Sequence, residues 1–182
     1  MPVVTLIGYR GTGKSTVAAA LAGALECAWI DADAALEAEC GMTIAELIRE
    51  RGEGGFRDAE GALLGTLLEG PAGVVATGGG VVLRPGNRDL LRARGGLVVW
   101  LTAPAATIRA RLAADPATAT RRPALGGGDV LAEVDAALAA REPLYRECAG
   151  FVVDASALPP AAVAAAILER LGGPGPARSG VR

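Results

Sequence analysis

Short runs of apolar residues alternate along the chain with longer stretches in which apolar positions recur every three or four residues. The short runs predict buried strands, and the longer stretches predict amphipathic helices. We expect five strands, at residues 2–7, 28–30, 73–77, 97–101 and 151–154. The run at 97–101 is apolar throughout, which predicts a central strand of a parallel sheet.

Helices are expected between these strands, at residues 15–25, from the second strand to about 40, 43–48, 56–68, 84–94, 104–114, 129–148 and 160–171. Thr43 and Glu46 have the spacing of a capping box, which opens a helix. Residues 53–55, Glu-Gly-Gly, predict a turn before the next helix. Pro143 predicts a kink or an interruption in the helix that contains it.

Strands that alternate with helices predict an α/β fold with a doubly wound parallel sheet. Two stretches break the alternation. Residues 115–128 are rich in Pro, Gly and Arg, and because the alternation resumes after them we expect a mobile flap there. Residues 172–182 form a Gly/Pro tail that we expect to be disordered. The sequence therefore predicts a single domain over residues 1–171.

The composition limits the classes of function. With 182 residues, 51 % of them apolar and only 3 % aromatic, the chain can bury one core, made mainly of Ala, Val and Leu. A net charge of −2 and a pI near 5.3 argue against a nucleic acid or an anionic membrane held by a broad basic surface. No apolar run reaches the roughly 18–20 residues of a spanning helix. The first strand leaves no room for a signal peptide, so we expect a cytoplasmic protein.

Histidine is absent from the chain, and cysteine occurs three times, as Cys27, Cys40 and Cys148. The absence of histidine excludes a Ser-His-Asp triad, a histidine general base and a histidine-ligated zinc ion. The cysteines lack metal-ligand spacing, and we expect free thiols in a reducing compartment.

The stretch from Gly8 to Thr16 fits the pattern of a phosphate-binding loop, or P-loop, placed directly between a predicted strand and a predicted helix. We expect the polyphosphate of a nucleotide to be bound by Gly11, Thr12, Gly13, Lys14, Ser15 and Thr16. Lys14 can reach the outer phosphates, and the Ser15 hydroxyl can hold Mg²⁺. Lys14 is also the only lysine of the chain, and a compact point charge suits this task better than the planar fork of arginine.

Other chemically distinctive residues follow the second and third predicted strands. Asp31 and Asp33 end the second, and the triple glycine Gly78-Gly79-Gly80 follows the third. Three glycines after a buried strand indicate close approach to the backbone, although a flexible loop is the alternative. Ligands of parallel α/β sheets bind outside the carboxyl ends of the strands, so these residues and the P-loop should meet in one crevice.

A second magnesium ligand is not obvious, because Thr77 stands where a carboxylate would usually end the third strand. Asp31 is the nearest candidate, either directly or through water. In an extended segment Asp31 and Asp33 project to the same side, so one could serve the metal and the other an acceptor hydroxyl. The alternative for Asp33 is a helix cap.

Arg57 and Glu60 fall within the apolar arc of the helix predicted at 56–68, and Arg141 falls on the apolar stripe of a later helix. Inward charges are costly unless they are paired or serve a polar pocket, so a structural ion pair is the alternative to a ligand site. Two such arginines favour a small anionic substrate, most naturally a carboxylate. Arg121 or Arg122 on the flap could close over the nucleotide phosphates.

Six motifs occur in order between about residues 3 and 170. They are the P-loop, Asp31-x-Asp33, Phe56-Arg57-x-x-Glu60, Gly78-Gly79-Gly80, Arg122-Pro123 and Arg141-Glu-Pro-Leu-Tyr145. In these motifs the chain resembles the shikimate kinase family. The resemblance implies ATP-dependent phosphorylation of the 3-hydroxyl of shikimate, with Mg²⁺, on the route to chorismate and the aromatic amino acids. It also implies the three-layer P-loop fold of nucleoside monophosphate kinases, with a five-stranded parallel sheet in the order 2-3-1-4-5.

The resemblance further implies roles for single residues. Asp33 would orient and deprotonate the acceptor hydroxyl, while Arg57 and Arg141 would hold the carboxylate of shikimate. The turn Gly78–Gly80 would offer the backbone N–H of Gly79, and Glu60 would support the pocket. Arg122 would act as a lid arginine at the ATP phosphates, although the extra Arg121 leaves open which arginine does so. A monomer is the default expectation.

Two other functions remain open from the sequence. A related small-molecule kinase, such as a gluconate kinase, would share the P-loop and also bind a carboxylate, but it would not predict Arg57, Glu60 and the triple glycine together. A nucleotide-binding regulatory protein without phosphoryl transfer would not need Lys14, Ser15, the aspartates and a lid arginine. We therefore expect a kinase that acts on shikimate.

Overall fold

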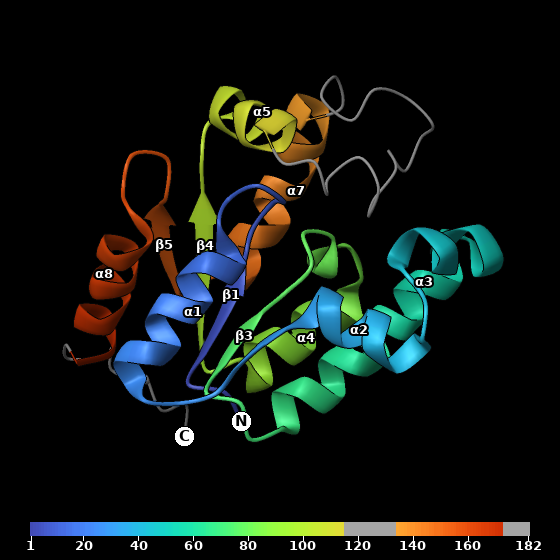
Figure 1. Ribbon diagram of the computed structural model, residues 1–182, viewed down its shortest axis with the longest axis horizontal. Helices are drawn as coiled ribbons and strands as arrows, with labels where there is room; N and C mark the ends of the chain where they lie inside the picture. The colour runs from blue at the N-terminus through green and yellow to red at the C-terminus, as the bar shows by residue number, and fades with distance from the viewer. Residues whose placement is uncertain (115–133, 173–182) are drawn as a thin grey trace, which may run out of the picture.

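The computed structural model describes residues 1–114 and 134–172 of the chain (Figure 1). A five-stranded sheet in the order β2-β3-β1-β4-β5 forms its middle layer. Its strands are β1 (Val4–Ile7), β2 (Trp29–Asp31), β3 (Val74–Ala76), β4 (Leu97–Thr102) and β5 (Phe151–Asp154). Every neighbouring pair is parallel. The fold class and the strand order are as expected. Strand β4, apolar from Leu97 to Leu101, lies inside the sheet between β1 and β5, and β1 holds the central position.

Helices cover both faces of the sheet. The helices α1 (Lys14–Leu25) and α8 (Pro160–Gly172) pack on one face, and α3 (Ile44–Glu69), α4 (Pro85–Arg94) and α7 (Val134–Cys148) lie on the other (Figure 1). Successive side chains of a strand point to opposite faces. In β1, Leu6 therefore joins the core under α1 and α8, while Ile7 joins the core under α3, α4 and α7.

The other helical segments are α2 (Ala32–Cys40), the 3₁₀ turn η1 (Val81–Leu83) and α5 (Ala105–Ala114). Gly41 ends α2 in the left-handed region, with a φ of 67° that favours glycine. Thr43 and Glu46 form the expected capping box at the start of α3, each side chain accepting a hydrogen bond from the backbone N–H of the other residue.

The turn expected at residues 53–55 is wrong, because these residues are helical. The break lies at Gly52, whose φ of 69° and ψ of 173° interrupt α3 for a single residue. A glycine can take this conformation without steric cost, so the chain changes direction there and resumes the helix at once. The second half of α3 then carries Phe56, Arg57 and Glu60 onto the sheet.

Pro143 does not interrupt its helix, since α7 continues through it to Cys148. The last turn is held by its core contacts, because Tyr145 and Cys148 are buried against β4 and η1. Packing of an apolar face outweighs the loss of one helical hydrogen bond here.

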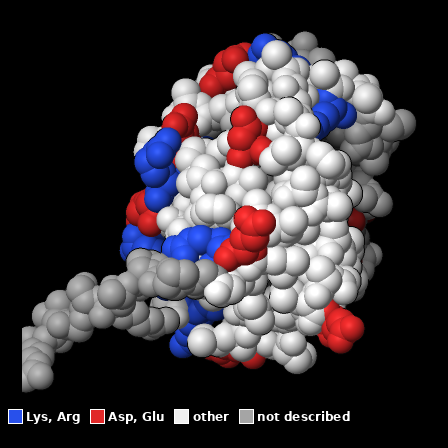
Figure 2. Space-filling model, turned by 90° about the vertical axis from the view of Figure 1, so that its left-hand side faces the viewer, with Lys and Arg blue, Asp and Glu red and all other residues white. Residues whose placement is uncertain are grey.

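The flap expected at 115–128 lies outside the described residues, as does the tail except for Gly172, which ends α8. None of the helices described for residues 1–114 and 134–172 combines the length and the hydropathy of a membrane-spanning segment. Figure 2 shows one face of the molecule, on which basic and acidic side chains are interspersed and do not gather into a broad basic area.

Candidate active site

The P-loop joins β1 to α1 and wraps around its own lysine. Lys14 is 8 % exposed, and its Nζ donates hydrogen bonds to the carbonyl oxygens of Gly8 and Tyr9, both at 2.8 Å. The Thr12 hydroxyl also donates to the carbonyl of Tyr9, at 2.7 Å. Gly8 has a φ of 140°, and a Cβ there would overlap the backbone of β4. The loop is thus preformed, with its ammonium group held beside the start of α1, where a helix favours anions.

Ser15 and Asp31 are brought together across α1 and β2, as expected for two magnesium ligands. The Ser15 hydroxyl donates to Oδ2 of Asp31 at 2.5 Å. The other carboxylate oxygen of Asp31 accepts from the backbone N–H groups of Asp33 and Ala34 and caps α2. A hydroxyl and a carboxylate oxygen are hard ligands of the kind that Mg²⁺ prefers, so the pair fits that ion.

The premise that Asp31 and Asp33 share an extended segment is wrong. The chain becomes helical at Ala32, so Asp31 is the N-cap of α2 and Asp33 lies in its first turn. The capping role considered for Asp33 therefore belongs to Asp31. A capping carboxylate satisfies N–H groups that would otherwise lack partners, which is why the helix begins where it does.

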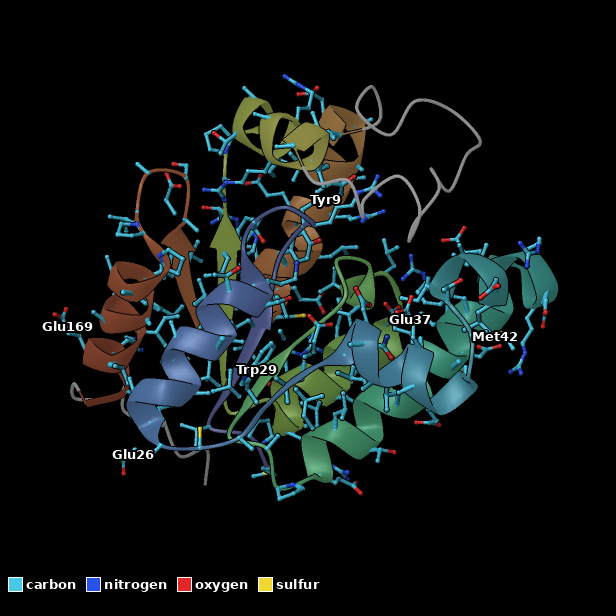
Figure 3. All side chains as sticks on the ribbon, viewed as in Figure 1. Tyr9, Glu26, Trp29, Glu37, Met42 and Glu169 are labelled. Atoms are coloured by element: carbon cyan, nitrogen blue, oxygen red, sulfur yellow. The ribbon has the colours of Figure 1, made fainter. Side chains whose placement is uncertain are left out.

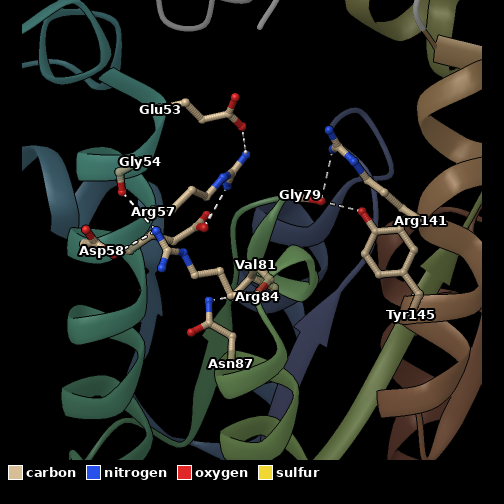
Figure 4. Close-up of polar contacts among 11 residues, drawn as sticks. Glu53, Gly54, Arg57, Asp58, Gly79, Val81, Arg84, Asn87, Arg141 and Tyr145 are labelled. Atoms are coloured by element: carbon tan, nitrogen blue, oxygen red, sulfur yellow. Dashed lines mark hydrogen bonds and ion pairs between the residues drawn. The ribbon is translucent and has the colours of Figure 1, made fainter. Parts of the chain in front are cut away.

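Arg57 and Glu60 form a buried ion pair one helical turn apart on α3. Nη1 of Arg57 lies 2.7 Å from Glu60 Oε2, and the two residues are only 6 % and 7 % exposed. Glu53 adds a contact of 3.5 Å to the other end of the guanidinium (Figure 4). Nε of Arg57 is buried without a hydrogen-bond partner among the described residues. The ion pair considered as an alternative therefore exists, but it leaves hydrogen-bonding capacity of the guanidinium unused.

The triple glycine lies between Arg57 and the P-loop. A Cβ on Gly80 would overlap the guanidinium of Arg57, and a Cβ on Gly79 would lie 3.0 Å from the backbone nitrogen of Arg10. The close approach predicted for this turn is thus made by the protein itself on two sides. Gly78, Gly79 and Gly80 are buried, and among the described residues the N–H groups of Gly79 and Gly80 donate no hydrogen bond. Buried N–H groups normally have an acceptor, so these two are available to a ligand or to water.

Arg141 and Tyr145 reach the same turn from α7. Both donate to the carbonyl of Gly79, Arg141 at 3.3 Å and the Tyr145 hydroxyl at 2.5 Å (Figure 4). The Arg141 guanidinium also lies 5.2 Å from the ring centre of Tyr9, a P-loop residue at the carboxyl end of the sheet (Figure 3). Burial raises the pKa of the Tyr145 hydroxyl well above its ordinary value, and the nearby Arg141 charge offsets only part of this rise.

These residues bring three basic side chains to one region, in which Glu60 and Glu53 already contact Arg57. Lys14 comes from the P-loop, Arg57 from α3 and Arg141 from α7, and the glycine turn lies between the two arginines. An arrangement of two guanidinium groups and free backbone N–H groups can bind a carboxylate and neighbouring hydroxyls. The ammonium group beside it can stabilise a phosphoryl group.

No sequence motif indicated the residues that lie next to the P-loop on the side of α5 and α8. A cavity of about 280 Å³ is lined there by Thr12, Gly13, Thr16, Val17, Arg111, Ala155, Leu158, Pro160 and Val163. Arg111 of α5 donates to the carbonyls of Gly11 and Ala155, at 3.2 and 2.8 Å, and so joins the P-loop to the segment after β5. Arg111 belongs to no motif, and only its place near the carboxyl end of a strand could have indicated it. The predicted lid residues Arg121 and Arg122 lie outside the described residues.

Comparison with known proteins places this geometry in a family. The family model described as shikimate kinase matches residues 10–172. The chain is 45 % identical to a shikimate kinase 2 of Sodalis glossinidius over 91 % of its own length and 93 % of that protein. It is 43 % identical to a shikimate kinase of Oleidesulfovibrio alaskensis over 96 % of its own length and all of that protein.

Comparison with solved structures leads to the same family. A shikimate kinase from Acinetobacter baumannii in complex with shikimate superposes with a TM-score of 0.85, at 33 % identity over 93 % of this chain and 92 % of that one. A gluconokinase from Sinorhizobium meliloti reaches a TM-score of 0.59 at 22 % identity, which shows a common fold alone. The chain belongs to the shikimate kinase family.

Proposed function

We propose that this chain transfers the γ-phosphoryl group of ATP to the 3-hydroxyl of shikimate, giving shikimate 3-phosphate and ADP on the route to chorismate. The observation that carries the proposal is the pair of arginines that meet at the glycine turn beside the P-loop. Arg57 is 6 % exposed and has an unused Nε, and Arg141 contacts the same turn from the other side. A carboxylate between them would use both guanidinium groups.

On this proposal the acceptor site is built from three elements. Arg57 and Arg141 bind the carboxylate of shikimate, and Glu60 keeps the guanidinium of Arg57 in place through their 2.7 Å ion pair. The N–H of Gly79, within the turn Gly78–Gly80, donates to a substrate oxygen. Asp33 receives the hydroxyl to be phosphorylated and accepts its proton as the oxygen attacks phosphorus.

The nucleotide site is proposed to use the backbone of residues 11–16 and the ammonium group of Lys14. Lys14 would leave the carbonyls of Gly8 and Tyr9 for the outer phosphates and stabilise the charge of the phosphoryl group during transfer. The 280 Å³ cavity near Arg111 lies beyond the loop, where it can take the base of the nucleotide. Arg122, with Arg121 as the alternative, is proposed to contact the phosphates and exclude water.

Ser15 and Asp31 would hold Mg²⁺, either directly or through water. When bound there, Mg²⁺ would supply charge neutralisation at the phosphate oxygens. The 2.5 Å contact between Ser15 and Asp31 supports this proposal, because it places two hard oxygen ligands next to each other beside the P-loop.

We further propose a monomer in the cytoplasm. One chain supplies all of the groups named above, and the three cysteines are free thiols. A sedimentation measurement at micromolar concentration would give a mass near 18 kDa. A stable dimer would contradict the monomer without touching the proposed activity.

The test of the activity is ADP release in a coupled assay, with shikimate, gluconate and other small hydroxy acids offered in turn. We expect rapid turnover of shikimate and little of gluconate, since gluconate lacks the cyclic shape of shikimate. Turnover of gluconate but not shikimate would instead favour a gluconate kinase. ATP binding with no turnover of any acceptor would favour a regulatory protein.

A further inference from the structure

The carbonyl of Gly79 accepts two hydrogen bonds from α7, and they are unequal. The Tyr145 hydroxyl donates at 2.5 Å and Arg141 at the longer distance of 3.3 Å. Tyr145 is 1 % exposed, and its ring stacks on Trp100 of β4 with 5.6 Å between the ring centres and 23° between their planes. Tyr145 is thus held rigidly, and its hydroxyl is aimed at the glycine turn (Figure 4).

The direction of this carbonyl fixes the next amide. In a trans peptide the C=O of Gly79 and the N–H of Gly80 share one plane and point in opposite directions. Gly80 in turn lies against the guanidinium of Arg57, so closely that a Cβ would overlap it. A hydrogen bond to the Gly79 carbonyl therefore fixes the direction of the Gly80 N–H and also sets the surface on which Arg57 rests.

Arg141 has two competing tasks. In the structure it donates to Gly79, but on the proposed function it must turn to the carboxylate of shikimate. A buried carbonyl that loses its donor costs free energy, so Arg141 could leave only if another donor stays. Tyr145 is that donor. Because burial raises the pKa of its hydroxyl, it keeps its proton throughout the pH range in which a kinase works.

We propose that Tyr145 is a positioning residue of the acceptor site, whose hydroxyl holds the Gly79–Gly80 peptide in place and frees Arg141 to bind the substrate carboxylate. The proposal rests on the function proposed above. Tyr145 itself touches no reacting atom. Its effect should therefore appear in the binding of shikimate and not in the binding of ATP.

The decisive variant is Tyr145→Phe, which keeps the stacked ring and removes only the hydroxyl. We expect the KM for shikimate to rise about 2- to 12-fold, the range of one buried hydrogen bond, while kcat and the KM for ATP stay within about twofold. The matched control is Ile167→Val on α8, a fully buried position on the opposite face of the sheet. This substitution should lower stability by a similar amount and leave both KM values unchanged.

Two spectroscopic readings separate positioning from general stability. The ¹³C shift of the Gly79 carbonyl should move in Tyr145→Phe and stay in place in Ile167→Val. In the unaltered protein, shikimate should also move this shift, because one of two donors leaves the carbonyl. This second reading needs no variant and remains decisive if Tyr145→Phe folds poorly.

Equal changes in the KM for shikimate and for ATP, or equal effects of the two variants, would overturn the proposal. So would a Gly79 carbonyl shift that does not respond to shikimate. If the unaltered protein released no ADP with shikimate, the proposed function would fail instead. The two failures are therefore distinguishable.

Discussion

The nucleotide half and the acceptor half of the site are built in different ways. The nucleotide half is one contiguous stretch, Gly8 to Thr16, and its ammonium group already has carbonyl partners at 2.8 Å. The acceptor half is collected from α3, the turn after β3, and α7. Among the described residues it contains groups without hydrogen-bond partners, namely Nε of Arg57 and the N–H groups of Gly79 and Gly80.

The difference shows in which half the binding of a ligand and the stability of the folded protein place opposite demands on the same residues. A loop that satisfies its own polar groups costs the folded protein little before the ligand arrives. A buried guanidinium with unused hydrogen-bonding capacity is costly, and a bound carboxylate would remove that cost. We therefore expect shikimate to stabilise the acceptor half, and substitutions there to affect binding and stability together.

The largest effect is expected at Lys14. Replacing it with alanine should lower kcat by about 10²–10³-fold, because a preorganised charge at the transferring phosphoryl group is lost. Lys14→Arg is the matched control, since it keeps the charge but replaces a compact ammonium with a planar fork, and it should recover only part of the rate. Steady-state ADP release measures both variants. A near-normal kcat for Lys14→Ala would remove Lys14 from the mechanism.

The next largest effect is expected at Arg57. Arg57→Ala should weaken shikimate binding by about 30-fold or more and leave ATP affinity unchanged, because a buried charged contact is lost only in the acceptor half. It should also lower the free energy of unfolding by about 3–5 kcal/mol, since Glu60 loses its buried ion pair. Calorimetric titration and urea unfolding measure the two effects.

The double variant Arg57→Ala/Glu60→Ala separates the effect on shikimate binding from the effect on the free energy of unfolding. Removing both charges should restore much of the lost stability without restoring shikimate binding. If shikimate binding returned with stability, or if ATP affinity fell as much as shikimate affinity, the ion pair would be purely structural. Arg57 would then not distinguish the acceptor half from the nucleotide half.

The smallest effect is expected at Tyr9, where the two halves touch. Tyr9→Leu removes the ring that lies 5.2 Å from the Arg141 guanidinium, and it should raise the KM for shikimate about two- to fivefold. Tyr9→Phe keeps the ring and should change little. The Tyr9 carbonyl still serves Lys14 in both variants, so the KM for ATP should stay constant. A larger change in the KM for ATP would mean that the two halves are not separable.

The sequence predicted the nucleotide half well because its signal is local. Strand, loop and helix follow one another within 25 residues, and the glycines, Lys14 and Ser15 have the spacing of a P-loop. The sheet was equally accessible, because buried parallel strands appear as separate apolar runs. Arg57 and Glu60 could be found as charges on an apolar arc, although the pattern did not decide between an ion pair and a ligand site.

The features that the sequence did not predict depend on contacts that no local sequence pattern contains. A turn was expected at residues 53–55, but the break in α3 lies at Gly52 and the helix resumes directly after it. Asp31 was expected to be extended with Asp33, but capping of α2 by Asp31 prevails. Tyr145 had no assigned task from its motif, because its partner Gly79 lies 66 residues earlier in the chain.

The solitary lysine has a consequence for chemical labelling. Apart from the amino terminus, the chain offers amine-directed reagents a single primary amine, the Nζ of Lys14. Lys14 is 8 % exposed and its Nζ donates to two carbonyls, so acylation there should be slow and should report only on the phosphate-binding loop. Beyond the label on the amino terminus, the mass added by such a reagent therefore counts open P-loops, because arginine side chains do not react with it.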